Sequence, residues 1–209
     1  MSARYPIVLD VTDRPCLVVG GGPIAEGKVR GLLAAGARVT VVSPTLTPAL
    51  AALAAEGRIA HRARGYAEGD LEGAALALAA TGDRAVSAAV LAEGRARGVW
   101  VNAADDPERC DFFLPAVLRR GALAVAVSTG GASPALTRAV RDELKRRLPP
   151  ELGDLVEVVA EVRRELRERA VPVTAEAWRG ALDDELARLH PTAPRDLVRA
   201  RLRARLEPR

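Results

Sequence analysis

The chain has 209 residues, of which 49% are hydrophobic and 28% charged, enough for one ordinary domain and a smaller appendage. It shows no apolar run as long as a membrane span and no signal-peptide pattern. Its two cysteines and two histidines offer neither a disulfide framework nor a zinc-type cluster. We therefore expect a protein of the reducing cytoplasm, with no membrane partner and no bound metal.

The start of the chain predicts two strands and a glycine turn. Residues 5–11 and 16–19 have strand character, and a turn at residues 12–15 joins them. After the second strand, Gly20, Gly22 and Ala25 fill the G-x-G-x-x-A pattern of a dinucleotide-binding unit. Gly20 permits a tight turn, and Gly22 lets the backbone approach a pyrophosphate without a Cβ in the way.

An amphipathic helix over residues 24–35 follows this turn, and its N-terminus presents unpaired N–H groups to an anion. The predicted cofactor-binding residues here are Gly20, Gly22, Pro23 and Ile24. The alternative is a glycine turn with a purely structural role, and the flanking strand and helix favour cofactor binding.

The next strand, residues 38–43, lacks the acidic residue that usually closes it and grips a ribose diol. Ser43, Pro44 and Thr45 occupy that place, so we expect weaker hydrogen bonds to the ribose. No arginine directly follows Ser43 to meet a 2′-phosphate, which favours NAD over NADP.

Strands and helices then alternate: a helix at 48–56, strands at 59–62 and 74–80, a helix at 84–97 and a strand at 99–102. This alternation predicts a Rossmann-type α/β fold with a parallel sheet. Ligands of such sheets bind beyond the carboxyl ends of the strands. The residues expected to converge there are Gly20–Ile24, Ser43, Thr81 and Asn102.

After residue 111 the pattern changes. Strands are expected at 114–118 and 122–128, and a helix at 134–147 begins with Ser133 as N-cap and Pro134 at its first position. The rest of the chain predicts helices at 151–169, 174–189 and 194–206. We therefore divide the chain into a Rossmann domain (1–112), a further segment (113–148) and an all-helical domain (149–209).

The terminal helix is rich in arginine between Arg195 and Arg205. One interpretation is the polar face of a helix whose apolar stripe comprises Leu197, Val198, Leu202 and Leu206. The other is a basic surface for an acidic ligand or nucleic acid, given the net charge of +4. An aromatic content of 3% leaves little for base stacking, so we expect no nucleic-acid partner.

The segment from Val101 to Pro107 follows a core strand and carries Asn102, Asp105 and Asp106. A carboxylate at this edge is placed to take a proton while a hydride leaves for a nicotinamide. The same residues also suit an Asx-type turn that closes the strand, and the residue types do not decide between the two.

Four blocks together resemble precorrin-2 dehydrogenase, the NAD-dependent family that also forms the amino-terminal part of sirohaem synthases. They are residues 18–25, 102–107, 113–116 and 128–136, in the order and spacing of that family. The resemblance runs from about residue 5 to residue 149. It implies oxidation of precorrin-2 to sirohydrochlorin with NAD as cofactor and, in some members, insertion of ferrous iron.

The resemblance also implies roles for particular residues. Asp105 matches the aspartate that serves as general base, and residues 113–148 match a segment that exchanges between the subunits of a homodimer. Precorrin-2 carries eight carboxylates, which suits basic residues. The candidate substrate-binding residues are Arg119, Arg120, Thr129, Gly130, Ser133, Arg138 and Arg141. Thr129 stands where some members have serine, and its function is open.

Two other classes compete with an enzyme. A nicotinamide-sensing module that binds cofactor without turnover usually keeps the strand-end acid that this chain lacks. A DNA-binding role for the basic tail has no helix-turn-helix pattern to support it.

Overall fold

The computed structural model describes residues 4–104, 106, 109–187 and 193–207. The chain divides into two compact units, residues 1–114 and 115–209, and each is described by itself. Asp105 lies outside the described residues.

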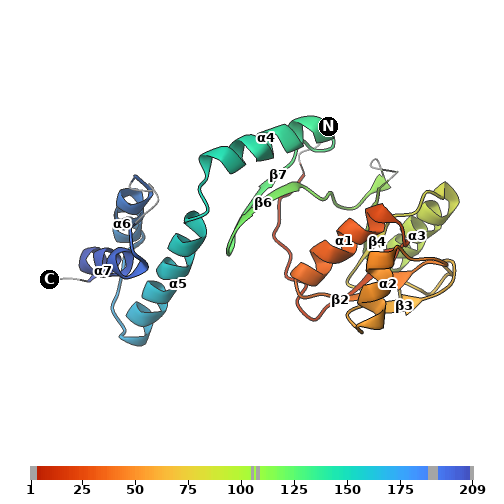
Figure 1. Ribbon diagram of the computed structural model, residues 1–209, viewed down its shortest axis with the longest axis horizontal. Helices are drawn as coiled ribbons and strands as arrows, with labels where there is room; N and C mark the ends of the chain where they lie inside the picture. Colours follow the sequence, from red (N-terminus) through yellow and green to blue (C-terminus); the bar gives the residue numbers. More distant parts are fainter. Residues whose placement is uncertain (1–3, 105, 107–108, 188–192, 208–209) are drawn as a thin grey trace. The chain divides into compact units, whose positions relative to one another are not determined.

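The first unit, coloured from red to yellow-green in Figure 1, is built on a five-stranded parallel sheet in the order β3-β2-β1-β4-β5. The strands are β1 (Pro15–Val19), β2 (Arg38–Val42), β3 (Ala60–Arg62), β4 (Leu76–Ala79) and β5 (Trp100–Ala103). The chain runs outward from β1 to β3 and then returns to β4 on the other side of β1. This reversal creates a crevice at the carboxyl ends of β1 and β4, the place where open α/β sheets bind ligands.

Helices cover both faces of this sheet. On one face, α1 (Pro23–Ala34) and α2 (Pro48–Ala55) pack on Val18, Val39 and Val41. On the other, α3 (Arg84–Arg97) packs on Leu17 and Val19. Both faces of the central strands are thus buried, which explains their continuous apolar sequences.

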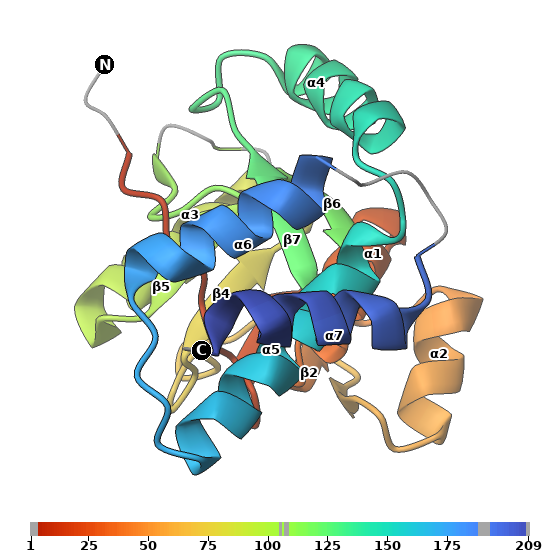
Figure 2. The same cartoon turned by 90° about the vertical axis from the view of Figure 1, so that its left-hand side faces the viewer.

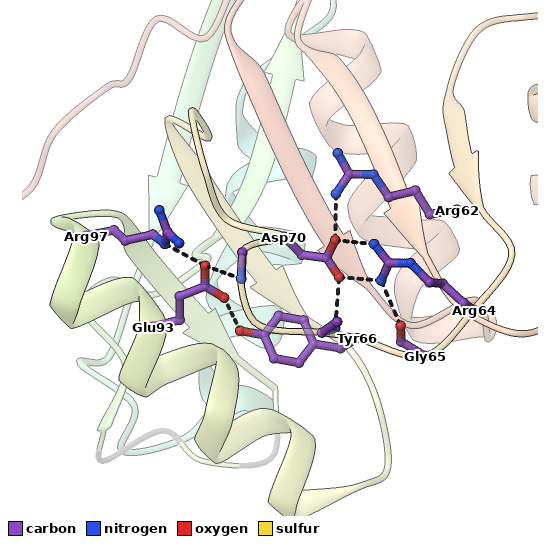
Figure 3. A network of polar contacts seen from close by, with 9 residues as sticks. Arg62, Arg64, Gly65, Tyr66, Asp70, Glu93 and Arg97 are labelled. Carbon is purple, nitrogen blue, oxygen red and sulfur yellow. Dashed lines mark hydrogen bonds and ion pairs between the residues drawn. The ribbon is translucent and has the colours of Figure 1, made fainter.

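Asp70 holds the long connection between β3 and β4 in place (Figure 3). Its carboxylate accepts hydrogen bonds from Arg62 at 2.6 Å, from Arg64 at 2.6 and 2.7 Å, and from the backbone N–H of Ala67 at 2.9 Å. Asp70 is buried, and the hydrogen bonds from Arg64 hold the pKa of its carboxyl well below the usual value. The loop is therefore anchored by one ionised group.

Glu93, a second buried carboxylate, ties the same connection to α3 (Figure 3). It accepts hydrogen bonds from the Tyr66 hydroxyl and from the Gly69 N–H at 2.9 Å, and it pairs with Arg97 at 2.6 Å. Burial and the bond to Glu93 raise the pKa of Tyr66 above its ordinary value. Both carboxylates serve the scaffold.

The second unit begins with an antiparallel hairpin, β6 (Ala116–Arg120) and β7 (Leu123–Val127). Helix α4 (Pro134–Arg147) packs on the hairpin, and α5 (Leu152–Glu168) starts against its turn. There a Cβ on Gly153 would lie 2.9 Å from the backbone of Arg120, so only glycine fits.

Helices α5, α6 (Ala175–Ala187) and α7 (Arg195–Leu206) form a bundle with its own apolar core (Figure 2). That core includes Val158, Val162 and Leu202. None of the helices described is long and apolar enough to span a membrane.

Most of the predicted elements are confirmed within two residues, and α3 and α4 have the predicted bounds. One prediction is wrong: residues 5–11 form no strand, and Tyr5 and Val8 are 87% and 99% exposed. Apolar residues alone do not make a strand, because the backbone groups of a strand need a neighbouring strand to bond with. The sheet of the first unit offers no such neighbour to residues 5–11. Leu197 is 49% exposed, so it lies outside the apolar stripe predicted for the last helix.

Candidate functional site

The glycine turn after β1 fits its surroundings only because Gly20 and Gly21 lack side chains. Gly20 has φ +119, and a Cβ there would lie 2.3 Å from the carbonyl oxygen of Ala80. On Gly21 a Cβ would lie 1.9 Å from the carbonyl oxygen of Thr45. The turn is therefore packed between the chain after β4 and the chain after β2, at the crevice of the sheet.

Gly22 differs from these two glycines because a Cβ built on it meets nothing within 4 Å. It is the N-cap of α1, and among the described residues no side chain accepts from the first N–H groups of this helix. In contrast, Thr47 caps α2 and Asp83 caps α3. Helix α1 thus starts with unsatisfied donors and a positive dipole end beside open space, an arrangement that suits a phosphate group.

Of the residues predicted for the ribose, the structure buries Ser43 and exposes Pro44 and Thr45. The Ser43 hydroxyl donates to the carbonyl oxygen of Thr45 at 2.7 Å, so its proton is used within the turn. Pro44 and Thr45 are the members of this set that a ligand can reach.

Thr81 and Asn102 lie at the same edge of the sheet but in different settings. The backbone nitrogen of Thr81 would be 3.2 Å from a Cβ on Gly20, so Thr81 adjoins the glycine turn. Asn102 is 7% exposed, and its amide nitrogen donates to the carbonyl oxygen of Phe112 at 3.0 Å. Its amide oxygen accepts from the ammonium of Lys28 at 3.0 Å.

Lys28 is a site residue that the sequence reasoning missed. It projects from α1 to the carboxyl end of β5, and burial lowers the pKa of its ammonium. It donates to a neutral amide, which leaves two of its three N–H donors for other groups. The available signal was its spacing from Ile24, since residues four apart lie on one face of a helix. Gly21 lies within the predicted segment Gly20–Ile24, but its packing against the loop that carries Thr45 was not predicted.

Of the two neighbouring aspartates, Asp105 lies outside the described residues. The carboxylate of Asp106 pairs with Arg109 at 2.6 Å. The nearby Cys110 is held by the backbone of Ala103 at 3.1 Å, and burial raises the pKa of its thiol.

The candidate substrate-binding residues all lie in the second unit, and several are occupied by local structure. Arg120 donates to the carbonyl oxygens of Leu148 and Lys145 at 3.1 and 3.0 Å, so it caps the C-terminus of α4. Arg141 pairs with Asp142 at 2.7 Å. Arg119 and Arg138 are exposed.

The loop before α4 forms a hydrogen-bonded cap. The Thr129 hydroxyl accepts from the Ser133 N–H and meets the Thr137 hydroxyl, both at 3.0 Å. The Ser133 hydroxyl accepts from the Leu136 N–H at 3.1 Å, as predicted for an N-cap. Gly130 has φ +65, which glycine adopts readily. These residues shape the start of α4.

Comparison with known protein families gives two matches. A family described as putative NAD(P)-binding matches residues 7–116, and one described as sirohaem biosynthesis protein central matches residues 120–147.

Related proteins and a solved structure agree with these matches. The chain is 48% identical over 164 residues to a siroheme synthase of Methylobacillus flagellatus, covering 78% of this chain and 35% of that protein. It is 39% identical over 206 residues to a siroheme synthase of Thioalkalivibrio sulfidiphilus, covering 97% and 42%. The chain thus spans well under half the length of these relatives. It also resembles the structure of SirC, precorrin-2 dehydrogenase, with a TM-score of 0.75, 28% identity and coverage of 97% of this chain and 98% of that one.

Proposed function

This chain belongs to the putative NAD(P)-binding family and is related to siroheme synthases, and from that premise we propose that it oxidises precorrin-2 to sirohydrochlorin with NAD. The reaction transfers a hydride to the nicotinamide and releases a proton, so precorrin-2 and NAD⁺ give sirohydrochlorin, NADH and H⁺. The observation that carries the proposal is the uncapped N-terminus of α1 behind Gly20–Gly22, in a chain that matches a precorrin-2 dehydrogenase over nearly its whole length.

The residues around this turn fit a dinucleotide. The N–H groups of α1 would receive the pyrophosphate, with Gly22 leaving room for close approach and Pro23 and Ile24 beside it. Exposed Pro44 and Thr45 would meet the ribose. NAD, when bound, supplies the hydride acceptor. The absence of an arginine directly after Ser43 supports NAD rather than NADP.

Asp105 is the proposed general base, with its carboxylate taking the proton that leaves the macrocycle. In the sequence it comes two residues after the end of β5, and the neighbouring Asp106 already pairs with Arg109. Lys28 and Asn102 fix the end of β5 from which this segment departs. Arg119 and Arg138, both exposed, are the candidate partners of substrate carboxylates.

Anaerobic incubation of the purified chain with NAD and precorrin-2 tests this function by the absorbance of NADH. An enzyme produces NADH in proportion to the sirohydrochlorin formed. Cofactor binding without NADH would instead identify a sensing module and refute the proposal.

We also propose that the protein is a homodimer joined through residues 113–148. The hairpin supports this, because Val117 on its outer face is 38% exposed while Leu118 on the face toward α4 is buried. Val125 pairs in register with Leu118 and therefore lies on the inner face of the hairpin. Val117 is thus the better residue with which to test an interface on the outer face. Val117→Glu should therefore shift sedimentation toward a monomer, and a monomeric wild type at micromolar concentration would exclude the dimer.

Ferrous iron is the proposed second substrate, inserted into sirohydrochlorin at the same site. Metallation also needs a base for the pyrrole protons, and Asp105 can serve both steps. Incubation of sirohydrochlorin with Fe²⁺, Co²⁺ or Ni²⁺ without oxygen tests this through the absorbance change of the macrocycle. The two unbonded cysteines support a reducing compartment, the cytoplasm, as the place of action.

A further inference from the structure

The helical bundle has a half-open pocket, here named the α5–α6 cavity, that none of the site residues lines. It has a volume of about 750 Å³ and lies between α5, α6 and the turn that joins them. Its wall is mainly apolar, with Val159, Leu166, Val171 and Trp178 among the lining side chains. Pockets of this size with few polar groups are typical of small-molecule sites.

Three arginines line this α5–α6 cavity: Arg163 and Arg167 from α5, and Arg179 from α6. All three are exposed, and none forms an ion pair with a carboxylate among the residues that the structure describes. The acidic residue of the lining is Asp183. The cavity therefore joins an apolar wall to an excess of positive charge.

The arginines on the other side of the bundle behave differently. Arg195 pairs with Glu157 at 2.8 Å and with Glu161 at 2.6 Å, and Glu165 binds both Arg199 and Arg203. One face of α5 thus neutralises α7, whereas its cavity face keeps its positive charge. This asymmetry is the feature that calls for an anionic occupant.

We propose that the α5–α6 cavity binds a tetrapyrrole, a flat apolar macrocycle with peripheral carboxylates, through residues that the proposed dehydrogenase site does not include. The apolar wall suits the macrocycle, and Trp178 suits contact with its ring. The arginines suit its peripheral carboxylates, which guanidinium groups bind with paired hydrogen bonds. A rigid ring loses little conformational freedom on binding, which favours it over a flexible fatty acid.

This inference rests on the proposed function, which supplies a tetrapyrrole as substrate and product. Retention of product on the helical bundle would keep a reactive macrocycle with the protein after oxidation. The cavity lies wholly within the second unit, so it can be tested without reference to the glycine turn.

The test uses Trp178 as a fluorescent reporter in the full-length chain. The chain has two tryptophans, and Trp100→Phe removes the one in β5. Uroporphyrin, a stable macrocycle with eight carboxylates, is the probe. We expect it to quench Trp178, and we expect the triple variant Arg163→Gln, Arg167→Gln, Arg179→Gln to raise its Kd about tenfold, since each exposed ion pair contributes modestly.

The matched control is Arg164→Gln, because Arg164 is an exposed neighbour on α5 that does not line the cavity. This variant should bind uroporphyrin like the parent. An equal loss of uroporphyrin affinity in the control and the triple variant, or no loss of affinity in either, would overturn the proposal. A lower mass of the triple variant in sedimentation would assign the cavity to a second copy of the chain and also overturn it.

NADH formation from precorrin-2 is measured on the same proteins. If NADH formation is normal and the three arginine substitutions leave uroporphyrin binding unchanged, tetrapyrrole binding in the cavity is refuted and the dehydrogenase proposal stands. Arginine-dependent quenching without NADH formation refutes the dehydrogenase and leaves the cavity as a polycarboxylate site.

Discussion

Adjacent substitutions in the glycine turn separate a packing role from a cofactor role. In Gly21→Ala the new Cβ would lie 1.9 Å from the carbonyl oxygen of Thr45, which must move by about 1.5 Å to reach an ordinary contact. Because backbone has to shift, we expect the upper end of the overpacking range, about 3 kcal/mol of unfolding free energy. The melting temperature should then fall by about 10 °C.

In Gly22→Ala the new Cβ meets nothing, and the extended backbone at φ −85 and ψ −174 suits any residue. Alanine is a poorer N-cap than glycine, so the cost should stay near or below about 1 kcal/mol. The methyl group would occupy the approach of the pyrophosphate and raise the Kd for NAD about tenfold or more. Gly22→Asp should abolish binding, since a carboxylate also repels the phosphates.

Thermal denaturation and calorimetric titration with NAD, applied to both alanine variants, check this reasoning. Wild-type affinity in Gly22→Ala would show that the pyrophosphate does not lie at this turn. Wild-type stability in Gly21→Ala would refute the packing of the turn against the loop after β2.

Three further predictions concern charged groups. Asp105→Ala should cut turnover about 10²–10⁴-fold with NAD affinity unchanged, whereas Asp106→Ala should have a much smaller effect on turnover. The reverse ranking would identify Asp106 as the general base. Lys28→Met should lower kcat about tenfold and cost about 1 kcal/mol of stability, because the buried amide oxygen of Asn102 loses its donor. The exposed Arg30→Met serves as control, and an unchanged kcat would exclude a role for Lys28. Asp70→Asn should lower the free energy of unfolding by about 2 kcal/mol near pH 7. Since the pKa of Asp70 is depressed in the folded protein, denaturant titrations should show this difference between wild type and variant shrinking as the pH falls below about 4. A difference independent of pH would contradict the ion pairs.

Local signals predicted the elements of the fold well. Asp83 and Gly98 mark the ends of α3, and Ser133 with Pro134 marks the start of α4, because capping depends on residues next to one another in the sequence. The strand predicted at residues 5–11 is absent for the opposite reason: their pattern suits a strand, but strand pairing depends on a neighbouring strand that is distant in the sequence.

The candidate site shows the same division between local and distant causes. The glycine pattern identified Gly20 and Gly22, but the need for glycine at position 21 comes from Thr45 on another loop. Lys28 and Asn102 are 74 residues apart and meet only through the sheet. Arg120 resembled a substrate contact in sequence, yet its guanidinium binds the C-cap residue of α4, Leu148, which lies 28 residues later.

Arginine content is therefore a poor guide to where an acidic ligand binds. The most basic stretch of the sequence is the last helix, but Glu157, Glu161 and Glu165 pair with its arginines across the bundle. Arginines paired in this way present little net positive potential to a ligand, whereas arginines outside ion pairs present a positive potential. The excess charge of this chain is thus better sought in the arginines that form no ion pair among the described residues, those of the α5–α6 cavity together with Arg119 and Arg138, than in the terminal helix.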